Sequence, residues 1–351
     1  MFDMGNEYHK LNKLIQNKKI LYIPIYSCFN YDTGKLNFKA DGNINRFLST
    51  FSHCNSFKYL NILYPPEGNN IDWFENSCKM ISDKITLLPC EYIVKSAKIE
   101  RSLEFADKVY NELKCLYRYD YIIVESQHLF LKFYNHEYKN LIYWCPVCAT
   151  NNKTRDFLEP FKELDRYIFS IANNIIVASD DQVEYVNSIN EGKGICRTLI
   201  QINQLIDRKL PCFNYIKQKD IKELFDSFKN YYKIFLPFRL TDKGYQMQEI
   251  FDYLYKIYNK SKAFKVFYTN PNNCDIYQFA KNDSYKKLFI DTNFIQVDKD
   301  RDTYYTIIDD CQVIIPYFED TEFICHAAID EFNCSNCIVC KNLDEFMTIL
   351  N

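Results

Sequence analysis

The feature that most constrains the fold of this chain is a repeated alternation between short apolar runs and longer amphipathic stretches. The apolar runs are typical of strands buried on both faces, and the stretches between them have helical periodicity. Strands that alternate with helices of this length indicate βαβ units and mostly parallel sheets. Strands are predicted at residues 20–26, 59–64, 85–89, 121–125, 141–147, 175–179, 233–238, 264–268, 288–291, 313–317 and 337–340.

The alternation is interrupted once, between residues 195 and 232, where the sequence becomes irregular and more basic. A chain of 351 residues is too long for one ordinary core. We therefore predict an α/β fold of two Rossmann-like domains, at residues 1–200 and 231–351, with a connection at residues 201–230. In such folds ligands bind at the carboxyl ends of the strands, here in a cleft across which the two sheets face each other.

Composition excludes several classes of protein. No apolar run reaches the roughly 18–20 residues that span a bilayer, and residues 1–19 are too polar for a signal peptide. We therefore expect a cytoplasmic protein with no membrane span, whose fifteen cysteines are reduced. The seven glycines form neither a dinucleotide-binding fingerprint nor a P-loop, which disfavours dehydrogenases and P-loop NTPases.

Two groups of cysteines have the spacing of metal ligands, namely Cys145 with Cys148, and Cys334 with Cys337 and Cys340. The two groups lie far apart in the chain, and each stands beside an apolar run. We interpret these cysteines as small buried hydrophobic residues. A zinc site or a redox pair is the alternative.

A cationic segment follows the strand predicted at residues 233–238, where Arg-Leu-Thr-Asp-Lys-Gly occupies residues 239–244. Arg239 and Lys243 flank a turn at the carboxyl end of that strand, and Gly244 starts the next helix. The first N–H groups of a helix and its positive dipole end attract phosphate, which arginine and lysine also bind. The pattern favours a diphosphate site, and the alternative is a solvated turn with two surface cations.

Two carboxylates follow the strand predicted at residues 313–317. Glu322 and Asp330 lie eight residues apart, a little over two helical turns, so they can share one face of a helix. Carboxylates can bind the hydroxyls of a sugar and a ribose, although acidic residues near a helix N-terminus also simply stabilise the helix. A diphosphate site and a hydroxyl site in one α/β domain suit a nucleotide-sugar.

These two segments, in this order, resemble the nucleotide-binding domain of GT-B glycosyltransferases. In many of these enzymes a strand ends in Arg-Leu, Lys-Gly begins a helix after a short turn, and a pair of glutamates eight residues apart follows. Here the turn is one residue shorter than is common, and aspartate replaces the second glutamate. The resemblance implies a UDP-sugar donor, with Arg239, Lys243 and Gly244 at its diphosphate, Glu322 at the transferred sugar, and Asp330, or alternatively Glu331, at the ribose. No Asp-x-Asp stands at a strand end, so no obligatory metal is indicated.

Two shorter segments resemble phage DNA glucosyltransferases, which glucosylate hydroxymethylcytosine in DNA. Residues 323–339 are similar to a stretch of the β-type enzymes, and residues 243–247 are similar to a segment of the α-type. This resemblance implies that the acceptor is a 5-hydroxymethylpyrimidine base in phage DNA and that the protein acts in the host cytoplasm. The alternatives are transfer to a cell-surface or capsid glycan, and a non-catalytic GT-B-like binding or partner protein.

The N-terminal half supplies the candidates for a base that deprotonates the acceptor hydroxyl. Asp32 and Asp41 lie in a long polar loop before the first predicted helix of the alternation, and Glu125 and His128 lie at the end of the strand at 121–125. The alternatives are a turn for Asp32, helix entry for Asp41 and a structural hydrogen bond for His128. The loop at residues 145–150, where the β-type phage enzymes would have their base, contains no carboxylate, so inverting and retaining chemistry both stay open.

Arg46, Lys153 and Arg155 are the candidates for contact with the acceptor or with a DNA backbone, and helix capping is the alternative for Lys153 and Arg155. The formal net charge of −3 divides into +2 for residues 1–230 and −5 for residues 231–351. Proteins that bind duplex DNA usually present a basic face. The asymmetry therefore places the less acidic half on the acceptor side and permits a DNA acceptor without requiring one.

Overall fold

The computed structural model describes residues 4–26, 29–30, 35–36, 38–40, 42–91, 99–113, 118–145, 159–178, 180–190, 198–202, 210–237, 247–259, 263–270, 275–291, 294–298, 300–316 and 336–350. The chain forms two compact units. The first consists of residues 1–151 and 157–214, and the second consists of residues 152–156 and 215–351. Each unit has its own hydrophobic core.

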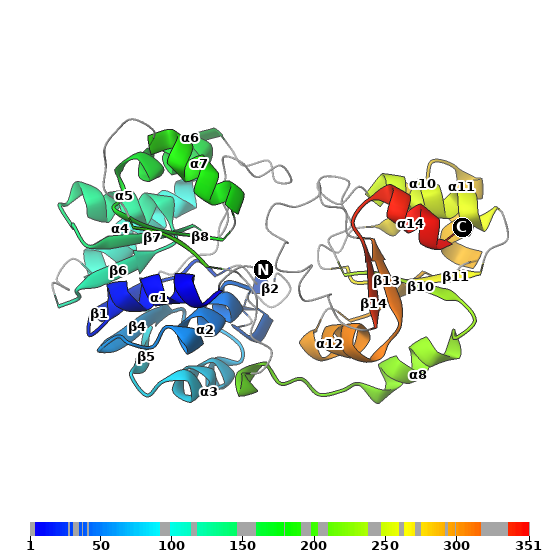
Figure 1. The fold of residues 1–351 in the computed structure, drawn as a ribbon, viewed down its shortest axis with the longest axis horizontal. Helices are drawn as coiled ribbons and strands as arrows, with labels where there is room; N and C mark the ends of the chain where they lie inside the picture. Colours follow the sequence, from blue (N-terminus) through cyan, green and yellow to red (C-terminus); the bar gives the residue numbers. More distant parts are fainter. Residues whose placement is uncertain are drawn as a thin grey trace. The chain divides into compact units, whose positions relative to one another are not determined.

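The N-terminal unit is built on a sheet of seven strands, all paired in parallel, in the order β5-β4-β1-β6-β7-β8-β9 (Figure 1). A separate antiparallel pair joins β2 to β3. The strands are β1 (Lys19–Ile23), β2 (Phe29–Asn30), β3 (Lys35–Leu36), β4 (Tyr59–Tyr64), β5 (Ile85–Pro89), β6 (Tyr121–Val124), β7 (Leu141–Cys145), β8 (Asn174–Val177) and β9 (Thr198–Gln201).

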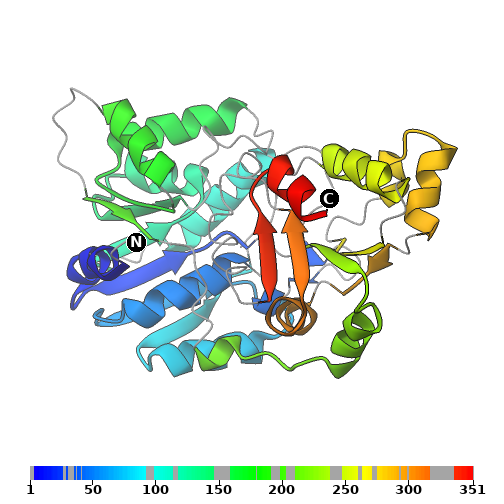
Figure 2. The same cartoon turned by 45° about the vertical axis from the view of Figure 1, so that its right-hand side comes forward.

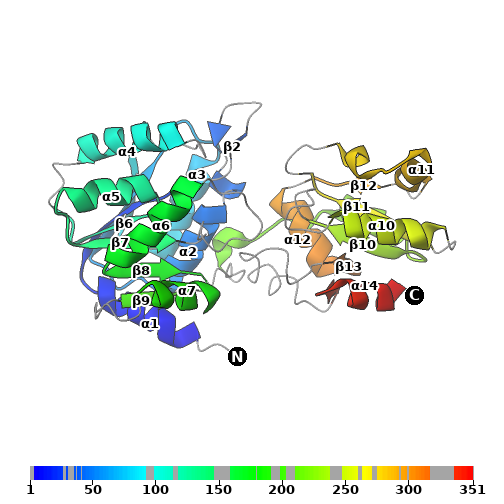
Figure 3. The same ribbon diagram turned by 90° about the horizontal axis from the view of Figure 1, so that it is seen from above.

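Helices cover both faces of this sheet. Helices α2 and α3 pack together on one face, and α4 to α7 pack in succession on the other, with α4 and α5 side by side (Figures 1 and 3). The helices are α1 (Met4–Ile15), α2 (Gly42–His53), α3 (Ile71–Ile81), α4 (Ile99–Leu113), α5 (Gln127–Asn135), α6 (Glu159–Ile171) and α7 (Asp180–Asn190), with 3-10 turns η1 (Phe38–Ala40) and η2 (Pro211–Phe213).

The order of the strands reverses between β1 and β6. From β1 the chain proceeds through β4 to the edge strand β5, and it then returns to β6 and continues outward to β9. The helices that follow β1 and β6 therefore lie on opposite faces of the sheet, and the carboxyl ends of these two strands form the switch point of the topology. In doubly wound sheets this switch point is where ligands bind.

The C-terminal unit repeats this plan with five parallel strands in the order β12-β11-β10-β13-β14. Its switch point lies between β10 and β13. Figure 2 shows β13 (orange) beside β14 (red). The elements are α8 (Lys219–Ser227), β10 (Tyr232–Leu236), α10 (Met247–Tyr258), β11 (Phe264–Tyr268), η3 (Ile276–Phe279), α11 (Asp283–Asp291), β12 (Ile295–Gln296), α12 (Arg301–Asp310), β13 (Val313–Pro316), β14 (Cys337–Cys340) and α14 (Leu343–Leu350).

The prediction of an α/β fold with mostly parallel sheets is confirmed, and apolar strands explain it. All five residues of β7 and all five of β11 are buried, as expected for central strands covered on both faces. The strand predicted at residues 288–291 is wrong, because this run forms the end of helix α11, and the strand β12 follows it. Leu288 is fully buried while Ile290 is 59% exposed, so the run belongs to an amphipathic helix.

The described cysteines of the two groups behave as the hydrophobic interpretation predicts. Cys145 and Cys340 are buried at the ends of β7 and β14, and Cys337 is partly buried. Burial raises the pKa of the Cys340 thiol to about 12, which keeps it protonated. Cys148 and Cys334 lie outside the described residues.

No helix in the described part of the chain is both long enough and apolar enough to cross a membrane.

Candidate functional site

Glu125 occupies the switch point of the N-terminal sheet, directly after β6. The residue is only 7% exposed. Its Oε1 accepts a short hydrogen bond from the hydroxyl of Tyr22 on the neighbouring strand β1, and its Oε2 accepts one of 2.7 Å from the backbone N–H of Ile25. The carboxylate thus fixes the chain as it leaves β1, on the edge of the sheet where ligands bind in this type of fold.

Two residues in the first turns of α2 extend this hydrogen-bonded network. The Asn43 side chain donates to the carbonyl oxygen of Ile25 at 2.5 Å and to Glu125 Oε2 at 3.5 Å. The Arg46 guanidinium donates to Asn43 Oδ1. We call Tyr22, Asn43, Arg46 and Glu125 the switch-point cluster. The predicted site residues Arg46 and Glu125 therefore lie in one network.

Burial determines the protonation state of the tyrosine in this cluster. The pKa of Tyr22 is raised well above its ordinary value, first because the ring is fully buried, and then because the Glu125 carboxylate lies against its hydroxyl. The charge of Arg46 opposes this shift. Tyr22 is thus a neutral donor, and its ring stacks on Phe47 of α2 with centroids 4.6 Å apart. The stacking holds α2 against β1, and the hydrogen bond to Glu125 ties β1 to the end of β6.

His128 lies in the first turn of α5, which Ser126 caps by accepting a hydrogen bond from the N–H of Leu129 at 3.4 Å. The imidazole packs edge-on against Phe161 of α6, with ring centroids 5.8 Å apart. Its Nε2 is buried and has no hydrogen-bond partner among the described residues. Burial lowers the pKa of His128 and favours the neutral ring.

The remaining candidates of the N-terminal half lie outside the described residues: Asp32, Asp41, Lys153 and Arg155. Asp41 immediately precedes α2, whose first turn carries Asn43. Tyr22 and Asn43 were not predicted from the sequence. A polar loop before α2 was the only signal for Asn43, and nothing in the run around Tyr22 distinguishes it from a core tyrosine.

The predicted donor residues also lie outside the described residues, but the strands that precede them are described. Strand β10 ends at Leu236 and β13 ends at Pro316, and the two strands pair in parallel through Ile234 and Ile314. Their carboxyl ends flank the switch point of the C-terminal sheet. In the sequence, the residues that follow β10 include Arg239, Lys243 and Gly244, and those that follow β13 include Glu322, Asp330 and Glu331.

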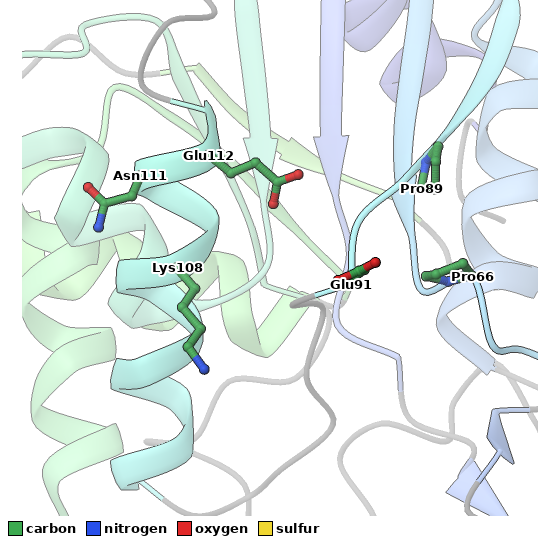
Figure 4. Close-up of a pocket in the computed structure, with 6 residues that line it drawn as sticks. All are labelled: Pro66, Pro89, Glu91, Lys108, Asn111 and Glu112. Atoms are coloured by element: carbon green, nitrogen blue, oxygen red, sulfur yellow. The ribbon is translucent and has the colours of Figure 1, made fainter.

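A groove that the sequence did not predict opens at the carboxyl ends of β4 and β5 (Figure 4). It has a volume of about 770 Å³ and is lined by Pro66, Pro89, Glu91, Lys108, Asn111 and Glu112. The first three residues follow or end the two strands, and the last three come from α4. Glu91, two residues beyond a strand end, was the only signal that sequence analysis could have used.

No protein-family model matches the sequence, and no curated protein is significantly similar to it. Solved structures, in contrast, share its fold at low identity. A sucrose-phosphate synthase from Thermosynechococcus elongatus has a TM-score of 0.55 at 12% identity, over 89% of this chain and 79% of that one. The lipopolysaccharide glycosyltransferase WaaG has a TM-score of 0.54 at 10% identity, over 94% and 89%.

A third similar structure contains a nucleotide. The MnaA protein of S. aureus, solved with UDP, has a TM-score of 0.50 at 12% identity, over 90% of this chain and 78% of that one. The comparisons lend no support to the narrower resemblance to phage DNA glucosyltransferases. What they show is the fold alone, which is an α/β fold of the GT-B type.

Proposed function

We propose that this chain is a glycosyltransferase that moves a sugar from a nucleotide-sugar to a hydroxyl acceptor. One observation carries the proposal: the predicted diphosphate and sugar residues follow β10 and β13, the two strands that flank the switch point of the C-terminal sheet. This is where a doubly wound sheet binds a nucleotide. The GT-B fold and the UDP seen in the S. aureus MnaA structure support a UDP-sugar as the donor.

In this proposal Arg239, Lys243 and the helix start predicted at Gly244 neutralise the charge that develops on the departing diphosphate. Glu322 binds hydroxyls of the transferred sugar. Asp330 binds the ribose, with Glu331 as the neighbouring alternative. Holding the donor and the acceptor in register supplies much of the rate enhancement, because the reaction within the complex is effectively unimolecular.

The base is proposed to come from the loop before α2, with Asp41 or Asp32 accepting the proton of the acceptor hydroxyl. Glu125 serves this loop better as a support than as a base, because both of its oxygens accept hydrogen bonds from protein donors and the residue is 7% exposed. His128 is a second candidate, since its neutral ring has the form that accepts a proton.

Two acceptors remain to be separated by experiment. The phage-type resemblance proposes a 5-hydroxymethylpyrimidine base in DNA, contacted by Arg46, Lys153 and Arg155. The alternative is a glycan, and the mixed carboxylate, amide and ammonium lining of the groove beside β5 favours it.

A donor-release assay tests the proposed function. The protein is mixed with a panel of nucleotide-sugars, alone, with hydroxymethylcytosine DNA, or with oligosaccharides, and the freed nucleotide and the mass of each acceptor are recorded. We expect nucleotide release together with a mass gain of one sugar on one acceptor. Donor binding without release in any mixture would instead favour a non-catalytic binding protein.

The Arg239→Ala variant tests the donor site directly. We expect UDP binding, measured by calorimetry, to weaken by about 1.5–3 kcal/mol, or roughly 10- to 150-fold, because a charged hydrogen bond to phosphate is lost. Lys256→Ala removes an exposed cation from α10 and serves as the matched control, with unchanged affinity. Equal affinity in wild type and Arg239→Ala would remove Arg239 from the donor site.

A further inference from the structure

The groove of Figure 4 lies on the same edge of the N-terminal sheet as the switch-point cluster. Pro66 follows β4, and Pro89 and Glu91 end and follow β5, so this wall of the groove consists of strand carboxyl ends. The opposite wall is the C-terminal half of α4, from which Glu112 extends toward the strands. A volume of about 770 Å³ is in the range of small-molecule sites.

The chemistry of the lining selects the ligand. The carboxylates of Glu91 and Glu112 accept hydrogen bonds from hydroxyls, and the Asn111 amide can both donate and accept. The rings of Pro66 and Pro89 add rigid apolar surface. This combination of hydroxyl acceptors beside apolar ring faces matches a sugar, which has hydroxyls at its rim and C–H groups on its faces.

The charge of the groove disfavours a phosphate-bearing ligand. Lys108, its one lysine among the described lining residues, forms an ion pair with Glu104 at 2.5 Å. Among the described lining residues, two carboxylates face this one paired ammonium, so this part of the lining is net negative. A DNA backbone would be repelled from it, whereas a neutral polyhydroxylated chain would not.

Part of the groove is held in place before any ligand binds. The Cys90 thiol donates a hydrogen bond to Glu112 Oε2 at 3.4 Å, and Cys90 is itself buried, with its N–H bonded to the carbonyl oxygen of Tyr64 at 2.8 Å. Glu112 on α4 is thereby tied to the ends of β4 and β5. Such preorganisation lowers the entropic cost of binding.

Strand spacing gives the distance to the reacting centre. Only β4 separates β5 from β1, and neighbouring strands lie about 4.8 Å apart, so the carboxyl ends of β5 and β1 lie about 10 Å apart. A ligand in the groove can therefore reach the switch point only if it continues along the sheet edge. That requirement fits a chain of linked sugars.

We propose that this groove binds the non-reacting sugar units of an oligosaccharide acceptor. The proposal rests on the proposed glycosyltransferase function and names the class of its acceptor. Glu91 and Glu112 are specificity-determining residues that accept hydrogen bonds from sugar hydroxyls, while the reacting hydroxyl lies at the switch point between β1 and β6.

The test measures the binding of trisaccharides of glucose, galactose, mannose and N-acetylglucosamine, and of a short hydroxymethylcytosine duplex, by calorimetry. The variants are Glu91→Gln and Glu112→Gln, singly and together. The matched control is Asp83→Asn, which makes the same charge change at an exposed residue before the amino end of β5. Thermal denaturation of each variant checks that the fold is intact.

We expect at least one trisaccharide to bind wild type and Asp83→Asn equally, and to bind the double variant at least about tenfold more weakly. Failure of every trisaccharide to bind, or equal binding by the double variant, would overturn the proposal. Loss of duplex binding in the same variants would also overturn it, because the groove would then take DNA. UDP affinity, measured on the same samples, separates the two proposals. Trisaccharide binding without UDP binding would support the proposed sugar-binding groove but contradict the proposed glycosyltransferase function.

Discussion

At the scale of single residues, Glu125 connects three segments of the N-terminal unit. It accepts hydrogen bonds from Tyr22 on β1, from the N–H of Ile25, and more weakly from Asn43 on α2. We expect Glu125→Ala to lower the free energy of unfolding by about 2–4 kcal/mol, because buried donors lose a charged acceptor. Urea denaturation measures this loss.

The exposed residue Glu163 on α6 supplies the control, since Glu163→Ala removes a carboxylate without burying a donor. Tyr22→Phe and the variant with both Tyr22→Phe and Glu125→Ala complete a double-mutant cycle. This cycle isolates the interaction free energy between Tyr22 and Glu125. If Glu125→Ala cost no more than Glu163→Ala, the switch-point cluster would not support the fold.

His128 makes the stability of the N-terminal unit depend on pH. Burial lowers its pKa in the folded state below the unfolded value of about 6.5. The unfolded chain therefore binds a proton first as the pH falls, so the contribution of His128 is fully present above about pH 6.5 and is lost as the pH falls through the lower folded pKa.

We expect wild type to lose stability between pH 7.5 and about 5 more steeply than His128→Leu, in urea denaturation at each pH. His9→Leu changes an exposed histidine and should keep the wild-type slope. Identical slopes in wild type and His128→Leu would show that the imidazole titrates equally in both states.

The residue scale also shows where sequence reasoning fails. The sequence suggested Glu125 because it follows the apolar residues of a predicted strand, and ligands bind at the carboxyl ends of parallel strands. It did not suggest Tyr22, whose partner lies 103 residues away in the chain. That contact exists only because β1 pairs with β6, and no local pattern encodes this pairing.

At the scale of elements, the predicted strands are mostly correct because central parallel strands are apolar throughout. Strand β9 was missed, since it is an edge strand in which only Ile200 of Thr198–Gln201 is fully buried, and it carries no apolar run. At residues 288–291 a strand was wrongly predicted, because a short apolar run at the end of an amphipathic helix has the same pattern as a buried strand.

Helix α8 lies in the segment that the sequence suggested as a connection, and it packs against α12 within the C-terminal unit. Phe225 is fully buried, and its ring stacks on Phe267 of β11 with centroids 3.8 Å apart. We expect Phe225→Ala to destabilise this unit by about 3–5 kcal/mol, measured by urea denaturation, because a large cavity remains. Asp226→Ala, one exposed position further along, should change stability little, and a similar small effect for Phe225→Ala would mean that α8 is only loosely docked.

At the scale of the whole molecule, the same doubly wound plan occurs twice, and each copy places polar sequence after the strands at its switch point. The repetition was predictable from the alternation of elements, because that pattern restarts after residue 232. The groove beside β5 was not predictable, since its walls come from strand ends and from Lys108, Asn111 and Glu112 of α4, which lie 17 to 21 residues beyond Glu91 in the chain.

Two units with separate cores allow the proposed division of labour to be tested in the full chain. UDP is proposed to bind the C-terminal unit, and a ligand at 100 times its Kd stabilises the state that it binds by about 2.7 kcal/mol. Hydrogen exchange with saturating UDP should therefore slow in peptides from residues 232–350, most strongly around β10 and β13, and the Arg239→Ala variant at the same UDP concentration should lose much of this protection. Protection from exchange is greatest where the ligand raises the free energy of local opening. Slower exchange confined to residues 19–202 would therefore place the nucleotide on the N-terminal sheet and reverse the proposed roles of the two units.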